Sequence, residues 1–258
     1  MSEPPPAVPV ESDVGPLLLP ASDRMIAVAL QRDGVWEPAE GEALRRLVRS
    51  GMTALDVGAH CGYFTLLLSR LVGPAGRVLA IEAEPGNHAL LEANIEAAGA
   101  KNVTTVHGAA WSTGGQTVPL TLCPENTGDH RSYAWESGRE VREVRTVAID
   151  DLTADRGPVD VVKLDTQGTE HRAVEGMRRT IERDRPTLLV EFWPTGIREL
   201  GDRPEDVLEL YRSLGLEPEA LGEPDTEIGA VALVEMADRA PTMFLNLILR
   251  PTASGSRR

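Results

Sequence analysis

The sequence of 258 residues has little of what would direct it to a membrane, an oxidising compartment or a nucleic acid. Its two cysteines, Cys61 and Cys123, are too few for a disulfide framework and lack the spacing of a zinc motif. No apolar run approaches the roughly 20 residues of a membrane span, and the N-terminus lacks the basic-then-apolar order of a signal peptide. The formal net charge is −14, which disfavours binding to a nucleic-acid backbone. We therefore expect a cytoplasmic protein with no membrane or nucleic-acid partner.

What the sequence does have is an alternation of short apolar strands with amphipathic helices. The pattern predicts strands at 54–56, 77–81, 103–106, 118–122, 141–147, 159–164, 187–190, 230–235 and 243–249. It predicts helices at 39–49, from 63 onward, and at 86–98, 170–182 and 205–215. Alternating strands and helices indicate an α/β fold, doubly wound, with a mostly parallel seven-stranded sheet and helices on both faces.

The chain length suits one such domain. Residues 1–20 are rich in proline and acidic, so we expect them to be disordered or loosely ordered, and 25–30 to form a short strand or hairpin. A single domain is expected over 21–250, followed by a flexible tail at 251–258.

The turn between the first strand and the next helix is the most informative segment. It reads Asp56-Val-Gly-Ala-His-Cys-Gly-Tyr63, with glycines at 58 and 62. Glycine allows tight turns and close approach of a ligand, and the helix that follows presents unpaired N–H groups. The second strand ends at Glu82, where a carboxylate can accept hydrogen bonds from both ribose hydroxyls of an adenosine. We predict a nucleotide-type cofactor site here.

The spacing of the turn favours S-adenosylmethionine (SAM) over NAD. A dinucleotide fingerprint has glycines where this chain has His60 and Tyr63. SAM carries a sulfonium cation and no phosphate, so an acid such as Asp56 near the turn suits it better than a pyrophosphate. The predicted cofactor-binding residues are Asp56, Gly58, His60, Gly62, Tyr63, Glu82, Ala83, Gly108 and Ala109. Trp111, after the third strand, is either part of the adenine frame or ordinary core.

Several segments together resemble the FkbM-type SAM-dependent methyltransferases. They are the turn from Leu55 to Phe64, Ile81-Glu-Ala-Glu-Pro85, Val161-Val-Lys-Leu-Asp-Thr-Gln-Gly-Thr-Glu170, Val190-Glu-Phe-Trp-Pro194 and Asn246-Leu-Ile-Leu-Arg250. The resemblance covers roughly residues 30–250, with His60 standing where asparagine is more familiar. It implies a class I methyltransferase fold and methylation of hydroxyls on sugars, polyketides or related natural products, with S-adenosylhomocysteine as the product. It does not identify the acceptor.

Methyl transfer to a hydroxyl needs an aligned oxygen and usually a group that takes its proton. His60, His171, His130 and Asp165 are the candidates. His130 lies in a long polar loop that could close over the acceptor, and Asp165 ends a buried strand, so these two are the predicted catalytic residues. Lys163, two residues earlier on the same face, should pair with a carboxylate, Asp165 or Glu191.

Residues around these positions are predicted to bind the acceptor, a small hydroxylated molecule: Asp129, Arg131, Glu191 and Trp193. Oxygen ligands at the strand ends could also hold a divalent cation, but the spacing alone does not predict a metal. A non-catalytic module with this fold, acting as a scaffold or regulator, is the alternative from another class. N-methylation is a variant within the enzyme class. The oligomeric state stays open, with a homodimer as one option.

Overall fold

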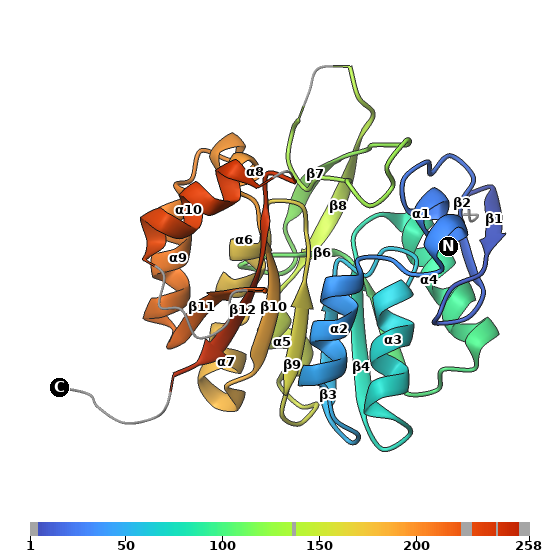
Figure 1. The fold of residues 1–258 in the computed structure, drawn as a ribbon, viewed down its shortest axis with the longest axis horizontal. Coiled ribbons are helices and arrows are strands. Elements are labelled where there is room, and N and C mark those ends of the chain that lie inside the picture. The colour runs from blue at the N-terminus through green and yellow to red at the C-terminus, as the bar shows by residue number, and fades with distance from the viewer. Residues whose placement is uncertain (1–4, 136–137, 223–228, 241, 253–258) are drawn as a thin grey trace.

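A seven-stranded sheet forms the middle layer of the protein in the computed structural model, which describes residues 5–135, 138–222, 229–240 and 242–252 (Figure 1). Its strands, in spatial order, are β11 (Leu216–Ala220), β12 (Leu245–Pro251), β10 (Thr187–Phe192), β9 (Val161–Leu164), β3 (Thr53–Val57), β4 (Arg77–Glu82) and β5 (Val103–His107). All neighbours are parallel except β12, which runs antiparallel to β10 and β11. The predicted doubly wound, mostly parallel sheet is confirmed.

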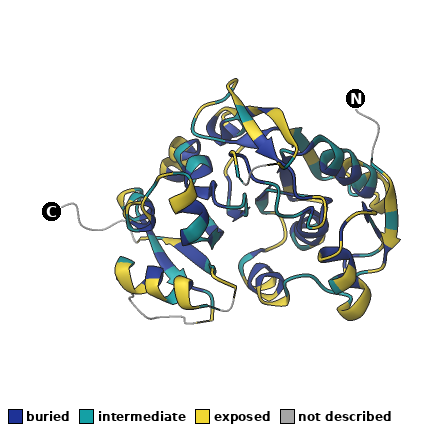
Figure 2. Cartoon of the chain, turned by 90° about the horizontal axis from the view of Figure 1, so that it is seen from above, coloured by how far each residue is buried: buried dark blue, intermediate teal, exposed yellow. Residues whose placement is uncertain are grey.

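Helices cover both faces of this sheet, because side chains alternate between faces along each strand. On one face, Ala54 and Val161 pack in a core with α1 (Ile26–Asp33), α2 (Pro38–Leu47), α3 (Tyr63–Val72) and α4 (Pro85–Ala98). On the other, Leu55 and Val162 share a core with α5 (Ile149–Thr153), α6 (Glu170–Glu175), α7 (Arg178–Asp184), α8 (Pro194–Glu199), α9 (Pro204–Ser213) and α10 (Ala230–Arg239). Figure 2 shows buried residues on the inner sides of these helices and exposed ones outside.

A smaller, three-stranded sheet stands beyond the carboxyl ends of the main strands. It consists of β6 (Ala109–Ala110), β8 (Val141–Val147) and β7 (Thr117–Thr121), in that order. The predicted strands at 118–122 and 141–147 therefore exist, but they belong to this separate sheet at the top of Figure 1. The polar loop between β7 and β8 extends over the edge of the main sheet where the candidate site lies.

The expectations for residues 5–30 were wrong, whereas residues 1–4 lie outside the described part of the chain. Residues 5–20 are ordered: β1 (Ala7–Val10) and β2 (Leu17–Pro20) form an antiparallel hairpin, because Leu17 and Leu19 are buried in a core shared with α3 and α4. The segment expected as a strand or hairpin at 25–30 begins α1 instead, with Ile26, Ala27 and Leu30 on its buried side. That spacing fits one helical face.

The C-terminal elements also depart from expectation. The strand expected at 230–235 is helix α10, which buries Leu233, Val234 and Ala237 at helical spacing. The helix expected at 170–182 is divided into α6 and α7, and strand β11 was not anticipated. The flexible tail expected from residue 251 is wrong for Pro251, which pairs with Leu216 in the sheet, and residues 253–258 lie outside the described residues. Within the described residues, no helix combines the length and apolarity needed to cross a membrane.

Candidate active site

The glycine turn lies against the end of β9. Gly58 has φ +83°, and a Cβ built there would stand 1.7 Å from the carbonyl oxygen of Asp165. Gly62 has φ +96°, and its Cβ would stand 2.7 Å from Leu91 Cδ1. Only glycine fits position 58, because a Cβ there would collide with backbone, whereas at position 62 the positive φ favours glycine and a Cβ would displace the end of the Leu91 side chain. The turn therefore brings the loop after β3 into direct contact with Asp165.

Glu82, at the end of β4, is buried and held by two backbone donors. Its Oε2 accepts the N–H of His60 at 2.8 Å, and its Oε1 accepts the N–H of Glu84 at 2.9 Å. Burial raises the pKa of the Glu82 carboxyl to about 7. Each carboxylate oxygen has a second lone pair, so Glu82 can accept two further hydrogen bonds from a ligand.

A cavity of about 50 Å³ lies at this carboxyl edge of the sheet. Its lining includes both predicted catalytic residues, His130 and Asp165, and six of the predicted cofactor residues: Gly58, His60, Glu82, Ala83, Gly108 and Ala109. Sequence reasoning missed other lining residues, Asn87, Thr127, Gly128, Ser132, Thr166, Gln167 and Thr169. Gln167 lies in the Lys-Leu-Asp-Thr-Gln-Gly segment, which could have indicated it.

Three predicted cofactor residues are not part of this lining. Asp56 stands opposite Lys163 in the parallel register of β3 and β9, so its side chain points beneath α3, where Oδ2 accepts the Thr65 hydroxyl at 2.5 Å. Tyr63 turns toward the N-terminal segment and donates to Asp13 at 2.8 Å. Gly62 lies against Leu91 of α4, where it allows α3 and α4 to approach closely. Asp56 and Tyr63 therefore point away from the cavity, because of the alternation along β3 and the direction of α3.

The polar loop closes the cavity from above. We call residues 123–135 the lid, because Thr127, Gly128, His130 and Ser132 all line the cavity. The Thr127 hydroxyl donates to Asp23 Oδ2 at 2.6 Å and lies 2.8 Å from His60 Nε2. Burial lowers the pKa of His60 to about 4, so its ring is neutral. Since the Thr127 proton goes to Asp23, His60 donates from Nε2, which ties the lid to the cofactor turn.

His130 is held in one tautomer. Its Nδ1 accepts the backbone N–H of Cys123 at 2.9 Å, and burial lowers the pKa of the ring to about 4. A neutral ring that accepts at Nδ1 carries its proton on Nε2. His130 therefore presents a hydrogen-bond donor at Nε2 and has no free ring nitrogen to accept a proton.

The far end of the lid is fastened through Arg131, which is buried. Its guanidinium pairs with Asp129 at 2.8 Å and with Glu199 at 3.1 Å. Its Cζ lies 3.3 Å from the ring centroid of Trp135 and 4.3 Å from that of Trp193. We call this arrangement the latch, because it joins the lid to α8. Three of the predicted acceptor-binding residues, Asp129, Arg131 and Trp193, thus lie together beside the cavity.

Asp165 is the centre of a polar network at the end of β9. Its Oδ2 accepts Lys163 Nζ at 3.0 Å, and its Oδ1 accepts Gln167 Nε2 at 2.8 Å. The same Gln167 amide reaches Glu191 Oε2 at 3.3 Å. Lys163 is buried and also lies 3.7 Å from Glu40. The predicted pairing of Lys163 with Asp165 is confirmed, whereas its second partner, Glu40 on α2, was not foreseen.

The other candidates lie away from the cavity lining. His171 is buried, and its Nε2 lies 3.0 Å from Asp202, so it is neither on a solvated helix face nor at the cavity. Burial lowers its pKa. Trp111 is half-buried, and its backbone N–H bonds Val147 beside β6.

A family model for the methyltransferase FkbM domain matches residues 56–217, more than half of the chain. This chain belongs to the FkbM methyltransferase family. The match begins at the turn and extends past the Asp165 network, so it includes the described cavity.

Curated relatives match this FkbM-family chain over a short segment. The human transmembrane O-methyltransferase is 42% identical over 64 residues, which are 24% of this chain and 22% of that protein. Protein-L-isoaspartate O-methyltransferase from Methanothrix thermoacetophila is 38% identical over 61 residues, 24% of this chain and 29% of that protein. The chain thus spans less than a third of the length of either relative.

Among solved structures, a candidate rRNA-methylase from Clostridium thermocellum superposes with a TM-score of 0.51 at 14% identity, covering 84% of this chain and 96% of that one. This likeness supports the fold alone, that of the class I SAM-dependent methyltransferases. Family and fold together support a SAM-dependent methyltransferase.

The functional groups that line the cavity suit SAM, but the volume of the cavity is too small to hold it. Glu82 offers acceptors for ribose hydroxyls, and Gly58, Gly108 and Ala109 line the cavity beside it. Pockets for small ligands usually enclose about 300–1,000 Å³. The cavity has about 50 Å³, and four of its lining residues, Thr127, Gly128, His130 and Ser132, belong to the lid. We infer that the lid moves away when SAM binds.

Asp165, Glu170 and Glu191 could hold a cation. Each offers an oxygen, and these oxygens lie within 4.8 Å of one another. Carboxylate oxygens suit hard divalent cations. At present Glu170 Oε1 accepts the N–H groups of Thr166 and Gly168, at 2.7 and 3.1 Å, so this carboxylate already has a structural task in shaping the loop after β9.

Proposed function

We propose that this chain is a SAM-dependent O-methyltransferase that acts on a hydroxyl of a sugar, a polyketide or another small natural product. The main support for this proposal is the position of Asp165 in the cavity, beside the residues that fit the cofactor. Its carboxylate is 21% exposed and lines the same cavity as Gly58 and Glu82. A polar acceptor group thus stands directly beside the residues that fit the cofactor.

The proton of the acceptor hydroxyl needs a destination. When bound, SAM supplies a methyl group activated by its sulfonium for in-line displacement by the acceptor oxygen. The hydroxyl would become strongly acidic as its oxygen took the methyl group, and Asp165 would receive its proton. Lys163 and Gln167 hold the carboxylate in one orientation, so the oxygen that receives the proton is positioned before the acceptor arrives.

His130 has a different role in this proposal. Because Nε2 carries the ring proton, His130 donates a hydrogen bond to the acceptor and orients its oxygen toward Asp165. Asp129, Arg131 and Trp193 would become available to the acceptor once the latch opens, together with Glu191 beside Gln167. Such a mixture suits a hydroxyl-rich small molecule.

Binding and turnover separate the possibilities. Saturating S-adenosylhomocysteine, at about 100 times its Kd, should raise the free energy of unfolding by about 2.7 kcal/mol. Asp165→Asn should bind this ligand within twofold of wild type, yet lose about 10²–10⁴-fold in kcat with labelled SAM and a panel of hydroxylated acceptors. Asp155→Asn, at an exposed position outside the cavity, is the matched control and should change neither.

Each other outcome rejects a defined part of the proposal. Failure to bind S-adenosylhomocysteine would favour a non-catalytic scaffold. Methyl transfer to amines alone would favour N-methylation. Full turnover in Asp165→Asn would assign proton transfer to another group.

A further inference from the structure

The buried ammonium of Lys163 has two carboxylate partners where one would neutralise it. Its Nζ pairs with Asp165 Oδ2 at 3.0 Å, and Glu40 Oε2 on α2 lies 3.7 Å from the same nitrogen. Among the ion pairs of the described residues, these are the partners of Lys163. Glu40 is itself buried, and burying a second carboxylate is costly. The pairing of Lys163 alone does not explain why the fold includes Glu40.

Glu40 is held in place by donors from two other parts of the chain. Asn246 of β12 donates from Nδ2 to Glu40 Oε1 at 2.7 Å. Glu37, which directly precedes α2, forms a hydrogen bond with the same carboxyl. Burial raises the pKa of both carboxyls, but well above the usual range only for Glu37, so Glu37 holds the proton of this pair and donates it. Glu40 is therefore the ionised partner, and its position is fixed before any ligand binds.

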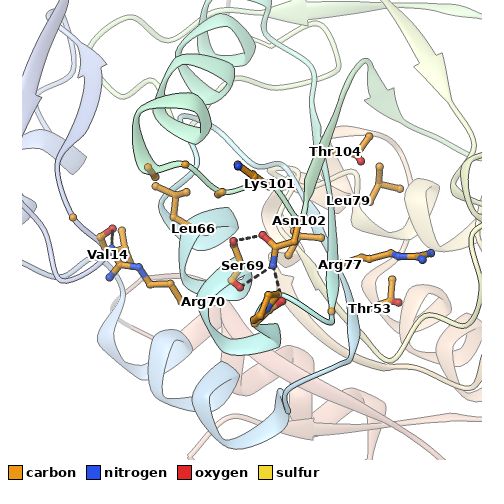
Figure 3. Close-up of a pocket in the computed structure, with 18 of the residues that line it drawn as sticks. Val14, Thr53, Leu66, Ser69, Arg70, Arg77, Leu79, Lys101, Asn102 and Thr104 are labelled. Atoms are coloured by element: carbon orange, nitrogen blue, oxygen red, sulfur yellow. Dashed lines mark hydrogen bonds between the residues drawn. The ribbon is translucent and has the colours of Figure 1, made fainter.

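A ligand in either cavity described here does not reach Glu40. Neither Glu40 nor Lys163 belongs to the lining of the small cavity, whereas Asp165 does. The larger cavity, of about 900 Å³, lies at the opposite edge of the sheet, beside Asn102 (Figure 3), and its lining includes none of these three residues. Glu40 can therefore influence an acceptor only through Lys163 and Asp165.

The second carboxylate becomes important when Asp165 takes a proton. In the proposed methyl transfer, the proton leaves the acceptor oxygen and binds Asp165, whose carboxylate becomes neutral, while Lys163 keeps its own proton. If Asp165 were its sole ion-pair partner, Lys163 would then be an unpaired charge in the interior, which is strongly unfavourable. Glu40 prevents this, because its carboxylate still faces Lys163 after the transfer.

We propose that Glu40 is a positioning residue for Asp165. It neutralises Lys163 independently of Asp165, so that Asp165 can accept the proton of the acceptor without leaving a buried cation unpaired. This inference rests on the proposed function. Without the charge of Glu40, Lys163 would hold Asp165 in its ionised form, and proton transfer to Asp165 would be slower.

Steady-state kinetics of Glu40→Gln with labelled SAM tests the proposal. This change removes the charge, keeps the size of the side chain and leaves an acceptor for Asn246. We expect kcat to fall about tenfold, less than in Asp165→Asn, with KM for the acceptor and Kd for S-adenosylhomocysteine within about twofold of wild type. Glu42→Gln, at an exposed position on the same helix, is the matched control and should keep the wild-type kcat.

Three further variants separate this role from a structural one. Glu40→Asp keeps the carboxylate and should lose less kcat than Glu40→Gln. In the Asp165→Asn background, Glu40→Gln should cause no additional loss, because the group on which Glu40 acts is absent. Asn246→Ala removes one donor to Glu40 from a half-buried position and should lower kcat to a smaller extent. Thermal unfolding verifies that each variant is folded, and Asn246→Ala tests the proposal if Glu40→Gln is not.

The outcomes distinguish this inference from the proposed function. Wild-type kcat in Glu40→Gln or in Asn246→Ala, equal losses in Glu40→Asp and Glu40→Gln, or an additional loss in the Asp165→Asn background would overturn the role of Glu40 and leave the proposed function in place. Absence of methyl transfer by the wild-type chain would reject the proposed function, and the role of Glu40 with it.

Discussion

Weakening the latch should tighten cofactor binding. The lid position described above leaves about 50 Å³ for a ligand that needs several times more. Any interaction that stabilises this closed position therefore opposes binding, because only the open fraction of molecules is competent. Trp135→Leu removes one aromatic face from Arg131 while keeping an apolar side chain, and Trp135→Phe keeps an aromatic ring.

The size of the effect follows from the geometry of the latch. Arg131 is 6% exposed and lies 3.3 Å from the Trp135 ring centroid. Cation–π contacts contribute about 0.5–1 kcal/mol at exposed sites and about 2 kcal/mol when desolvated. Trp135 is itself half-buried, so we take about 1 kcal/mol. That energy corresponds to a change of about fivefold in the opening equilibrium and in the apparent Kd.

Calorimetric titration with S-adenosylhomocysteine tests this directly. Trp135→Leu should bind about fivefold more tightly than wild type, and Trp135→Phe should lie between them. Equal or weaker binding by Trp135→Leu would refute the reasoning, since the latch would then persist in, or stabilise, the liganded state.

Other substitutions follow from the same geometry. Gly58→Ala should lower the free energy of unfolding in urea by about twice as much as Gly115→Ala. Both positions have positive φ, worth about 1–3 kcal/mol, but only the Cβ at 58 would meet backbone; equal losses would contradict the close contact. Lys163→Met should cost about 3–5 kcal/mol in the same assay, because Asp165 loses its buried cation; a loss below 1 kcal/mol would contradict this. Burial raises the pKa of Glu170 to about 7, so the folded state binds the extra proton and stability falls as pH rises from about 4.5 through 7. Glu82, whose pKa is also raised to about 7, contributes to the same slope, so Glu170→Gln should reduce it without abolishing it in urea unfolding measured across pH. An unchanged slope would contradict the contribution of Glu170.

The sequence predicts the central elements well because they are governed by local rules. The turn with Gly58 and Gly62 and the strand ends at Glu82 and Asp165 follow from alternation and glycine placement, and all are confirmed. The pairing of Lys163 follows from the cost of a buried charge. These arguments need only a few neighbouring residues.

The sequence predictions are wrong where the local structure depends on contacts with residues far away in the sequence. The segment from Ala230 reads as apolar and β-branched, but its burial against α8 and α9 selects a helix. The second partner of Lys163, Glu40, lies on a different helix. The polar loop was recognised, but its filling of the cavity depends on Thr127 meeting Asp23, which no local pattern encodes.

The placement of the lid has an evolutionary consequence. The lid lies between β7 and β8, in a small sheet separate from the one that carries Gly58 and Glu82. Mutations that lengthen or exchange this insertion leave the strands beneath the cofactor cavity intact. Acceptor preference can therefore diverge among descendants of one ancestral scaffold without a new cofactor site having to arise each time.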